Sequence, residues 1–474
     1  MNKYILIIVS AFLLFSCSDE DYAELNTDLV NPQDVSEDAL FNGATISLFD
    51  QMESTNVNRN VFRLLSQYWT ETTYIDEANY DLNNRNVPGN HWTILYDHVL
   101  FSLNDSKKKV LANAALSEEE KIGRVAQITI LEVYTWQILV DTFGDIPYSE
   151  ALLDRENPTP AYDDAEEIYM DLFNKLDQVI PTLGGSIGFP DVNYYGNMDL
   201  WAKFANSLKL KLAIRMADYN PSLAMTKVSE AYNAGVFTSN ADNFIIRYEG
   251  ANPNTNPLWN DLVESGRSDF VVANTFVDYL NALDDPRRKV FFDDNIDSGY
   301  VGGIYGDNNS FSEYTHIGTV FHEPTLRGVL MDYSEVSFYL AEAAARGWSV
   351  GNTVQDYYEN GISANFESWG LTEQELQDYL NDDNVDYNMA SGDWKEKIGF
   401  QMWIAMYNRG FEGWTTWRRL GSPELNLPAD SGLPVPLRYT YPQDEQTLNK
   451  TNYEAASAAI GGDTQQTPIF WDVN

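Results

Sequence analysis

The feature that most constrains the fold is a series of paired amphipathic helices separated by short breaks. Within this series, residues 126–140 carry a single charged side chain, Glu132, so the helix they predict is apolar on nearly every side. Such a helix is stable only when other helices surround it, which places it at the centre of a helical array. The chain has 474 residues, 44% of them hydrophobic, which is enough to bury a large core.

Three segments share a helix–turn–helix pattern. The predicted helices pair 119–143 with 163–180, 201–218 with 222–234, and 333–346 with 353–369. The repetition favours a mainly α fold of tetratricopeptide-like hairpins, although no strict register of about 34 residues is present. Strand-like runs are few and short, and the clearest is FIIRY at 244–248.

Long loops rich in Asn, Asp, Gly, Tyr and Trp lie between and after the hairpins. They span residues 74–90, 250–269, 293–323 and nearly everything past Pro423. Loops of this length in a compact protein are usually functional or disordered, and the aromatic content argues against disorder. We therefore expect an irregular ligand-binding region carried on the helical hairpins.

The acidic balance of the chain excludes several partners. Lys and Arg total 30 whereas Asp and Glu total 71, which gives a formal charge of −41. Such a surface repels nucleic acid and anionic lipid, so neither is an expected partner. A strongly acidic glycan is also less suited as a ligand, unless a local basic pocket overrides the net charge.

The only cysteine, Cys17, ends an N-terminal targeting segment. A positive residue, Lys3, precedes an apolar run from Ile5 to Phe15 and the small residue Ser16. This order is typical of a signal peptide, and LFSC at the cleavage point fits a loose lipobox. We predict that Cys17 is the lipidated first residue of the mature protein. The alternative is an ordinary secretory signal with an incidental cysteine.

No catalytic or zinc motif stands out. The four histidines are scattered, and HEPT at 322–325 lacks the second histidine of a metalloprotease motif. Neither a G-x-S-x-G elbow nor a phosphate loop is present. A glycosidase needs only two carboxylates, so a surface glycoside hydrolase stays open as an alternative to binding without catalysis.

Two acidic loops are candidate cation sites. DDNIDSG at 293–299 and DDNVDYN at 382–388 place oxygen ligands at alternate positions, as calcium loops do. Neither has the sixth-position glycine or the twelfth-position glutamate of an EF-hand. We interpret both as solvated turns and expect no metal site, with calcium kept as an alternative.

The tryptophan- and arginine-rich block at 411–425 could suit a sugar or an acid. However, Phe411, Trp414 and Arg418 recur at helical spacing, and Glu412 can pair with an arginine. We interpret this block as packing plus an internal ion pair. Three further tryptophans are assigned to the core: Trp92, Trp136 and Trp201.

Seven blocks along the chain follow the order of a known family pattern. They are FGDIPYSEAL (143–152), YDDAEEIY (162–169), WAKFANSLKLKLAIRMAD (201–218), DPRR (285–288), MDYSEVSFYLAEAAARGW (331–348), FEGWTTWRRLGSPEL (411–425) and LRYTYPQDEQTLN (437–449). Together they resemble the SusD/RagB family, and more narrowly its SusD-like subgroup of outer-membrane nutrient-binding lipoproteins. The run SDED after Cys17 is similar to the signal that sends lipoproteins of the Bacteroidota to the outer face of the outer membrane.

The resemblance implies a function and a partner. It implies a lipid-anchored protein, facing the cell exterior, that binds a nutrient glycan and delivers it to a SusC-like TonB-dependent transporter, over which it acts as a lid. Peptide import, as in RagB-like members, is the alternative. The chain then divides into a signal peptide (1–16), a flexible tether (17–33) and a SusD/RagB-like nutrient-binding domain (34–474).

The loops supply the candidate binding residues, because stacking on a sugar needs rigid aromatic area ringed by polar groups. The predicted ligand-binding residues are Tyr74, Asn79, Tyr80, Asp81, Arg85, Trp259, Tyr300, Tyr305 and Tyr314. The first five form one mixed cluster, Trp259 follows the proline-punctuated run NPNTNP, and the last three lie in a loop rich in Gly and Asn. We predict that at least two of the aromatic residues form the platform. The alternative is that each packs its own loop.

Overall fold

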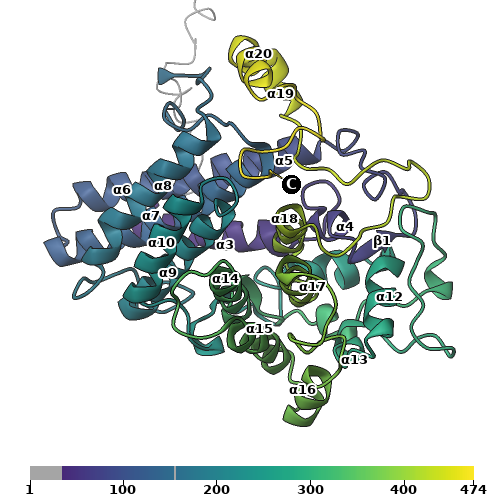
Figure 1. Cartoon of the computed structure of the whole chain (residues 1–474). Helices are drawn as coiled ribbons and strands as arrows, with labels where there is room; N and C mark the ends of the chain where they lie inside the picture. The colour runs from purple at the N-terminus through teal and green to yellow at the C-terminus, as the bar shows by residue number, and fades with distance from the viewer. Residues whose placement is uncertain (1–34, 154–155, 474) are drawn as a thin grey trace, which may run out of the picture.

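Helices dominate the structure, as the sequence predicts (Figure 1). The structure is a computed structural model and describes residues 35–153 and 156–473. The predicted signal peptide, Cys17 and the tether lie outside the described residues. Within the described part of the chain, no helix is both long and apolar enough to cross a bilayer.

All three predicted hairpins are confirmed. They are α7 (Glu118–Phe143) with α8 (Ala165–Val179), α9 (Met198–Arg215) with α10 (Pro221–Ala234), and α14 (Tyr333–Ala345) with α15 (Val354–Ser368). Two more packed pairs join them: α3 (Glu37–Glu53) with α6 (Phe101–Ala112), and α17 (Trp394–Ala405) with α18 (Gly410–Leu420). In Figure 1, α6 to α10 lie on the left, α18 lies near the centre above α14 and α15, and α17 lies to the right of α14.

Local side chains fix where these helices begin. Ser117 and Glu120 form a capping box at the start of α7, and Thr353 and Asp356 form another at the start of α15. At α10, the Asn220 side chain accepts a hydrogen bond from the Leu223 backbone. Each cap satisfies backbone N–H groups that have no partner inside the helix. The hairpin boundaries read from the sequence therefore have a local cause.

Shorter helices and two small sheets fill the remainder of the described chain. The shorter helices are α4 (Phe62–Leu65), α5 (Val87–Thr93), α11 (Pro257–Trp259), α12 (Asn274–Ala282), α13 (Arg288–Phe291), α16 (Glu373–Leu380), α19 (Gln443–Leu448) and α20 (Lys450–Ala459). β1 (Trp69–Glu71) pairs antiparallel with β3 (Phe270–Val272), and β2 (Phe244–Ile246) pairs antiparallel with β4 (Gly328–Met331). β2 confirms the predicted strand over its first three residues.

Two loop predictions need correction. The stretch past Pro423 is not a continuous loop, because α19 and α20 form a small helical pair within it (yellow in Figure 1). The stretch 250–269 contains α11 and a π-helical segment at Asn260–Glu264. These helices are short, and sequence periodicity is weakest over so few residues.

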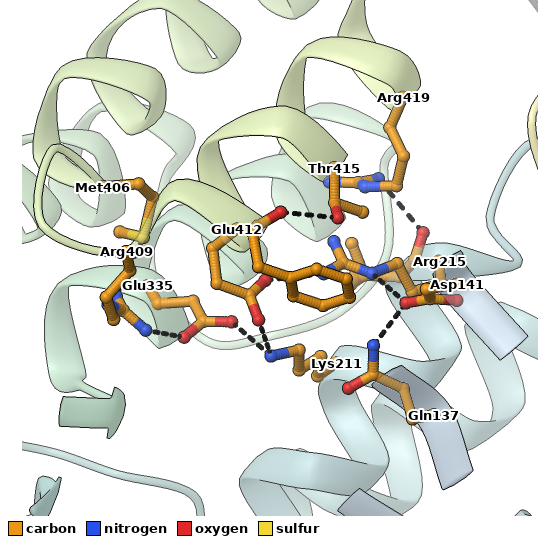
Figure 2. A network of polar contacts seen from close by, with 12 residues as sticks. Gln137, Asp141, Lys211, Arg215, Glu335, Met406, Arg409, Glu412, Thr415 and Arg419 are labelled. Carbon is orange, nitrogen blue, oxygen red and sulfur yellow. Dashed lines mark hydrogen bonds and ion pairs between the residues drawn. The ribbon is translucent and has the colours of Figure 1, made fainter. Parts of the chain in front are cut away.

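A buried network of charges joins the hairpins to one another (Figure 2). The Lys211 ammonium on α9 pairs with Glu412 on α18 and lies 3.2 Å from Glu335 on α14. The Arg215 guanidinium lies 2.6 Å from Glu412 and 3.2 Å from Asp141 on α7. The block at 411–425 is therefore packing with an internal ion pair, as predicted, and Glu412 is the partner of two cations.

Aromatic rings complete the core around this network. The Arg418 guanidinium lies 3.6 Å from the centre of the Trp414 ring and 4.8 Å from that of Trp471. Trp471 is buried, and its indole N–H donates a hydrogen bond of 2.7 Å to Asp141. The core assignment of three further tryptophans is confirmed by their burial: Trp92, Trp136 and Trp201.

Candidate functional site

Three predicted loops meet on one side of the helical array, next to β1. The Asn79 amide donates a hydrogen bond of 2.9 Å to the Gly306 carbonyl and accepts one of 2.8 Å from the Ser431 backbone. The Ala429 backbone donates one of 2.8 Å to the Tyr305 carbonyl. These bonds tie together segments more than 120 residues apart in sequence. The side chain of Asn79 therefore joins loops and is committed to the protein itself.

Tyr80 and Tyr305 hold these loops together from inside. Their rings are only 2% and 1% exposed and lie 6.1 Å apart. The Tyr305 hydroxyl donates to the Leu64 carbonyl at 2.8 Å, and burial raises the pKa of Tyr80 to about 12. A ring enclosed on both faces cannot stack on a ligand. The prediction that these two tyrosines belong to an exposed platform is therefore wrong, and they pack their own loops.

Tyr74 is the predicted aromatic residue that the structure leaves open. Its ring is 62% exposed, and its backbone, in the loop between β1 and α5, has a φ of 60°. The Arg85 guanidinium lies 5.7 Å from the centre of the ring, a distance at which a cation is attracted to an aromatic face. Tyr74 and Arg85 thus form one amphipathic unit, as the sequence predicts.

A hollow of about 180 Å³ adjoins this unit. Arg85 lines it together with Arg267, Asp261 and Asp269, which come from the segment leading into β3. The Arg267 side chain is half exposed and pairs with Asp269 at 2.5 Å. Sequence analysis missed these residues because they lie almost 200 positions from Tyr74 and reach it only through the pairing of β1 with β3. We call Tyr74, Arg85 and this hollow the Tyr74 surface.

Two buried glutamates, Glu71 and Glu77, hold the loop between β1 and α5 that carries Tyr74. Glu71 ends β1 and accepts a hydrogen bond of 2.9 Å from the Ala78 backbone, and Glu77 pairs with Arg85 at 2.6 Å. Burial and the neighbouring Glu77 raise the pKa of Glu71 well above its ordinary value. Their side chains are buried, so they hold the loop from below and do not face a ligand.

The other predicted residues lie apart from Tyr74. Asp81 is exposed, while Trp259, Tyr300 and Tyr314 are half-buried. Tyr300 packs edge-on against Phe292, with the centres of the rings 5.2 Å apart. Trp259 directly precedes the π-helical segment that holds Asp261, but the binding role of all four residues stays a prediction.

The two predicted cation loops stay unassigned. Within residues 35–153 and 156–473, no three Asp, Glu, His or Cys side chains are grouped to hold a metal ion. In the second loop, Asp382 and Asp386 accept hydrogen bonds from backbone N–H groups two residues further on. That is the usual behaviour of aspartates in turns.

A second, larger cavity contains none of the predicted residues. It measures about 600 Å³ and is bounded by β2, β4, the end of α15 and the turn between α17 and α18. Trp369, Arg247 and Arg327 line it, among others. No local sequence signal marks these residues as a group, because they come from segments spread over more than 120 positions. Trp369 reads in the sequence as the apolar end of a helix.

Comparison with known proteins gives consistent matches. A family model described as starch-binding and associating with the outer membrane, SusD-like, matches residues 29–442. A chitin-binding SusD homologue from Flavobacterium johnsoniae is 26% identical, with a TM-score of 0.79 over 92% of this chain and 99% of its own. A SusD homologue from Bacteroides uniformis is also 26% identical, with a TM-score of 0.78 over the same shares.

No curated protein sequence is significantly similar to the chain. The family match nevertheless covers most of its length, and the solved structures share its fold from α3 to the C-terminal region. The helical hairpins and the joined loops are therefore features of a known architecture. The chain belongs to the SusD-like family of starch-binding proteins that associate with the outer membrane.

Proposed function

We propose that this protein binds a nutrient glycan at the Tyr74 surface and delivers it to a SusC-like TonB-dependent transporter. Family membership supports the class of function, since the family is described as starch-binding and a similar solved protein is chitin-binding. The observation that carries the location is the 62% exposure of the Tyr74 ring beside a guanidinium.

The chemistry of the Tyr74 surface suits a neutral sugar. A sugar ring has an apolar face that stacks on an exposed aromatic ring, and its hydroxyl groups need both donors and acceptors. Arg85 and Arg267 supply donors, and Asp261 and Asp269 supply acceptors around the hollow. One exposed ring and a shallow hollow favour weak to moderate affinity, as a protein that must release its cargo requires.

The proposal includes the anchor and the partner. Cys17 carries the lipid, the polar tether at 17–33 lets the domain move, and the protein faces the cell exterior. The family association with the outer membrane supports this location. In this arrangement, the protein closes over the barrel once a glycan is bound.

We propose that binding proceeds without hydrolysis. A glycosidase of the usual kind needs two carboxylates that both reach the scissile bond. The two carboxylates that line the hollow are engaged within the protein, because Asp261 accepts hydrogen bonds from the Ser54 hydroxyl and the Thr55 backbone and Asp269 pairs with Arg267. Glu71 and Glu77 are buried and support the loop. This supports a binding role for the surface over the glycoside hydrolase alternative.

Calorimetry with a panel of chito- and malto-oligosaccharides tests the proposal. We expect one class to bind and to remain intact. Tyr74→Ala should weaken that binding by about 1–3 kcal/mol, the usual cost of removing an aromatic anchor, and leave the melting temperature unchanged. Tyr219→Ala is the matched control, because Tyr219 is also exposed (41%) but lies in the turn between α9 and α10.

Three results would contradict the proposal. Equal affinities for Tyr74→Ala and Tyr219→Ala would show that the glycan binds elsewhere. Hydrolysis abolished by a single carboxylate substitution would favour the glycoside hydrolase. Binding of short peptides and of no oligosaccharide would replace glycan import with peptide import.

A further inference from the structure

The cavity of about 600 Å³ lies away from the Tyr74 surface and has its own chemistry. Its upper wall is the β2–β4 sheet, and its opposite wall is the turn that follows α15. Ala405, Asn408 and Arg409, at the end of α17 and the start of α18, also line the cavity. This volume is in the range of pockets that bind one or two sugar units or a similar small molecule.

Two exposed arginines at this cavity lack a carboxylate partner. Arg327 donates one hydrogen bond of 2.9 Å to the Ser368 carbonyl, and Arg247 donates one of 3.4 Å to the Tyr195 hydroxyl. Among the described residues, neither forms an ion pair. In a chain with 71 acidic and 30 basic residues, most cations are paired, so two unpaired arginines at one cavity are unusual. Their remaining N–H groups are free to bind an anion, and a guanidinium fork matches a carboxylate.

The walls of the cavity offer aromatic surface. Trp369 and Tyr248 both line it, and Trp369 packs edge-on against Phe291 with the ring centres 5.4 Å apart. The Tyr248 hydroxyl is bound to Asp50 at 2.9 Å. In contrast, the Trp369 indole N–H donates to no residue in the part of the chain that the structure describes. The cavity therefore has an open donor on a flat apolar ring, which suits a sugar.

Asp332, which also lines the cavity, offers one open hydrogen-bond acceptor. The side-chain amides of Asn365 and Asn408 already bond to arginines and to backbone or carboxylate oxygens of the protein. Asp332 accepts from the Glu335 backbone and from Arg409 through Oδ1 alone. Its Oδ2 has no partner among the described residues, and the side chain is 13% exposed. This oxygen can accept a hydroxyl hydrogen from a bound molecule.

We propose that this cavity is a second binding site, for a carboxylate-bearing sugar unit such as a hexuronic acid. The sugar carboxylate binds Arg247 and Arg327, the ring packs on Trp369, and a hydroxyl donates to Asp332 Oδ2. This cavity supplies the local basic site that an acidic glycan needs on so acidic a protein. The proposal is independent of the Tyr74 surface, with which it shares no residue.

The Trp369 indole resonance in a nitrogen-15 NMR spectrum gives a local test. Trp369→Phe assigns the resonance by its loss. Glucuronate should shift it saturably, with a dissociation constant in the millimolar range. Glucose has the ring without the carboxylate, and acetate has the carboxylate without the ring. At the same ionic strength, the affinity of each should therefore be lower than that of glucuronate by a factor of about ten or more. No saturable shift with glucuronate would overturn the proposal. Equal binding of glucose or acetate would overturn the ligand class.

Charge variants test the assigned roles of the arginines. Arg327→Gln should weaken glucuronate binding about tenfold, since a charge-assisted hydrogen bond is lost, and should leave glucose unaffected. Lys450→Gln removes the same charge from an exposed site on α20 and should change neither. Glu323 lines the same cavity, so Glu323→Gln should strengthen glucuronate binding several-fold. Unchanged affinity in both Arg327→Gln and Glu323→Gln would overturn the proposal.

Tyr74→Ala separates this site from the proposed glycan surface. It should leave the glucuronate shift of Trp369 unchanged while it weakens oligosaccharide binding. A loss of both activities in Tyr74→Ala would mean that the two regions form one site, which would overturn the independence of the cavity. If the wild-type protein binds glucuronate but no oligosaccharide, the result would count against the Tyr74 surface only.

Discussion

Glu412 illustrates how a single buried charge is stabilised in this fold. Its carboxylate pairs with Lys211 and Arg215, which both come from α9 (Figure 2). Burial alone would raise the pKa of Glu412, but Lys211, Arg215 and Arg409 outweigh it and lower the pKa to about 2. Replacing a whole buried network with apolar groups can be neutral, whereas removing one member leaves the others unpaired.

We therefore expect Glu412→Gln to lower the free energy of unfolding by roughly 3–5 kcal/mol, because two buried cations lose their anion. Urea denaturation at neutral pH measures this loss. Glu424→Gln is the control, since Glu424 is exposed and should change stability by less than about 0.5 kcal/mol. Equal losses in the two variants would contradict the prediction.

The same variant has a pH signature. The folded pKa of Glu412 lies below its ordinary value of 4.5, so its contribution to stability is present above pH 4.5 and is lost as the pH falls toward 2. Glu412→Gln should remove this part of the acid dependence. An acid-unfolding curve as steep as that of the wild type would mean that other carboxylates dominate.

At the scale of single residues, the sequence predicted only part of the Tyr74 surface. The mixture of aromatic and polar residues at 74–85 correctly brought Tyr74 and Arg85 together. It could not distinguish Tyr74 from Tyr80, because a tyrosine ring serves equally well as a platform or as packing. The difference depends on contacts with distant loops, because the Tyr305 ring lies 6.1 Å from the Tyr80 ring and the Gln67 amide donates a hydrogen bond to the Tyr80 hydroxyl, whereas the Tyr74 ring is 62% exposed.

Among the elements, α14 and α15 pack closely because of a glycine. At Gly361 on α15, an added Cβ would lie 2.8 Å from the Phe338 ring on α14, closer than such atoms approach. The Ser334 hydroxyl on α14 also donates a hydrogen bond of 2.7 Å to the Gly361 carbonyl. The absence of a side chain therefore sets the distance between the two helices.

Two glycine-to-alanine substitutions separate helix propensity from packing. Gly361→Ala should lower the free energy of unfolding by about 1–2 kcal/mol, because overpacking exceeds the gain in propensity. Gly43 is exposed on α3, and an added Cβ there would meet no atom within 4 Å. Gly43→Ala should therefore raise that energy by about 0.5–1 kcal/mol. Thermal unfolding of both variants measures the difference, and a change of the same sign in both would contradict it.

The sequence predicted the long hairpins well and the short elements poorly. α7, α9 and α14 each combine a long run of regularly placed or continuous apolar residues with a side-chain cap, so local signals agree over many residues. α19 and α20 have six and ten residues and few buried side chains, which gives almost no apolar period to detect. The small sheets depend on pairing between strands of three or four residues far apart in the chain, and no local pattern encodes such pairing.

For the whole molecule, the net charge of −41 and the proposed lipid act together. Acidic protein is repelled by anionic lipid headgroups, so a covalent anchor is needed to hold it at a membrane surface. A flexible tether then allows the charged domain to stand away from the headgroups while it remains at high local concentration near a transporter.

Cys17→Ala should therefore separate the protein from both the membrane and the barrel. We expect mass spectrometry of the wild type to find lipid on Cys17, and the variant to be unlipidated and absent from complexes purified from native membranes. Thr27→Ala, in the tether but outside the SDED run, is the control and should retain lipid, location and partner. An unmodified mature protein that begins at another residue would contradict the anchor, and a wild-type protein that purifies without a barrel would contradict the partner.

The position of Trp471 has a consequence for the order in which the molecule is made. Its indole binds Asp141, 330 residues earlier, and thereby completes the interior of the first hairpin. During synthesis, α7 and α8 emerge long before that partner exists, so their interior stays incomplete until almost the whole chain is available. A polypeptide that cannot finish folding early stays unfolded for longer, and an unfolded chain is the form that is exported across the inner membrane.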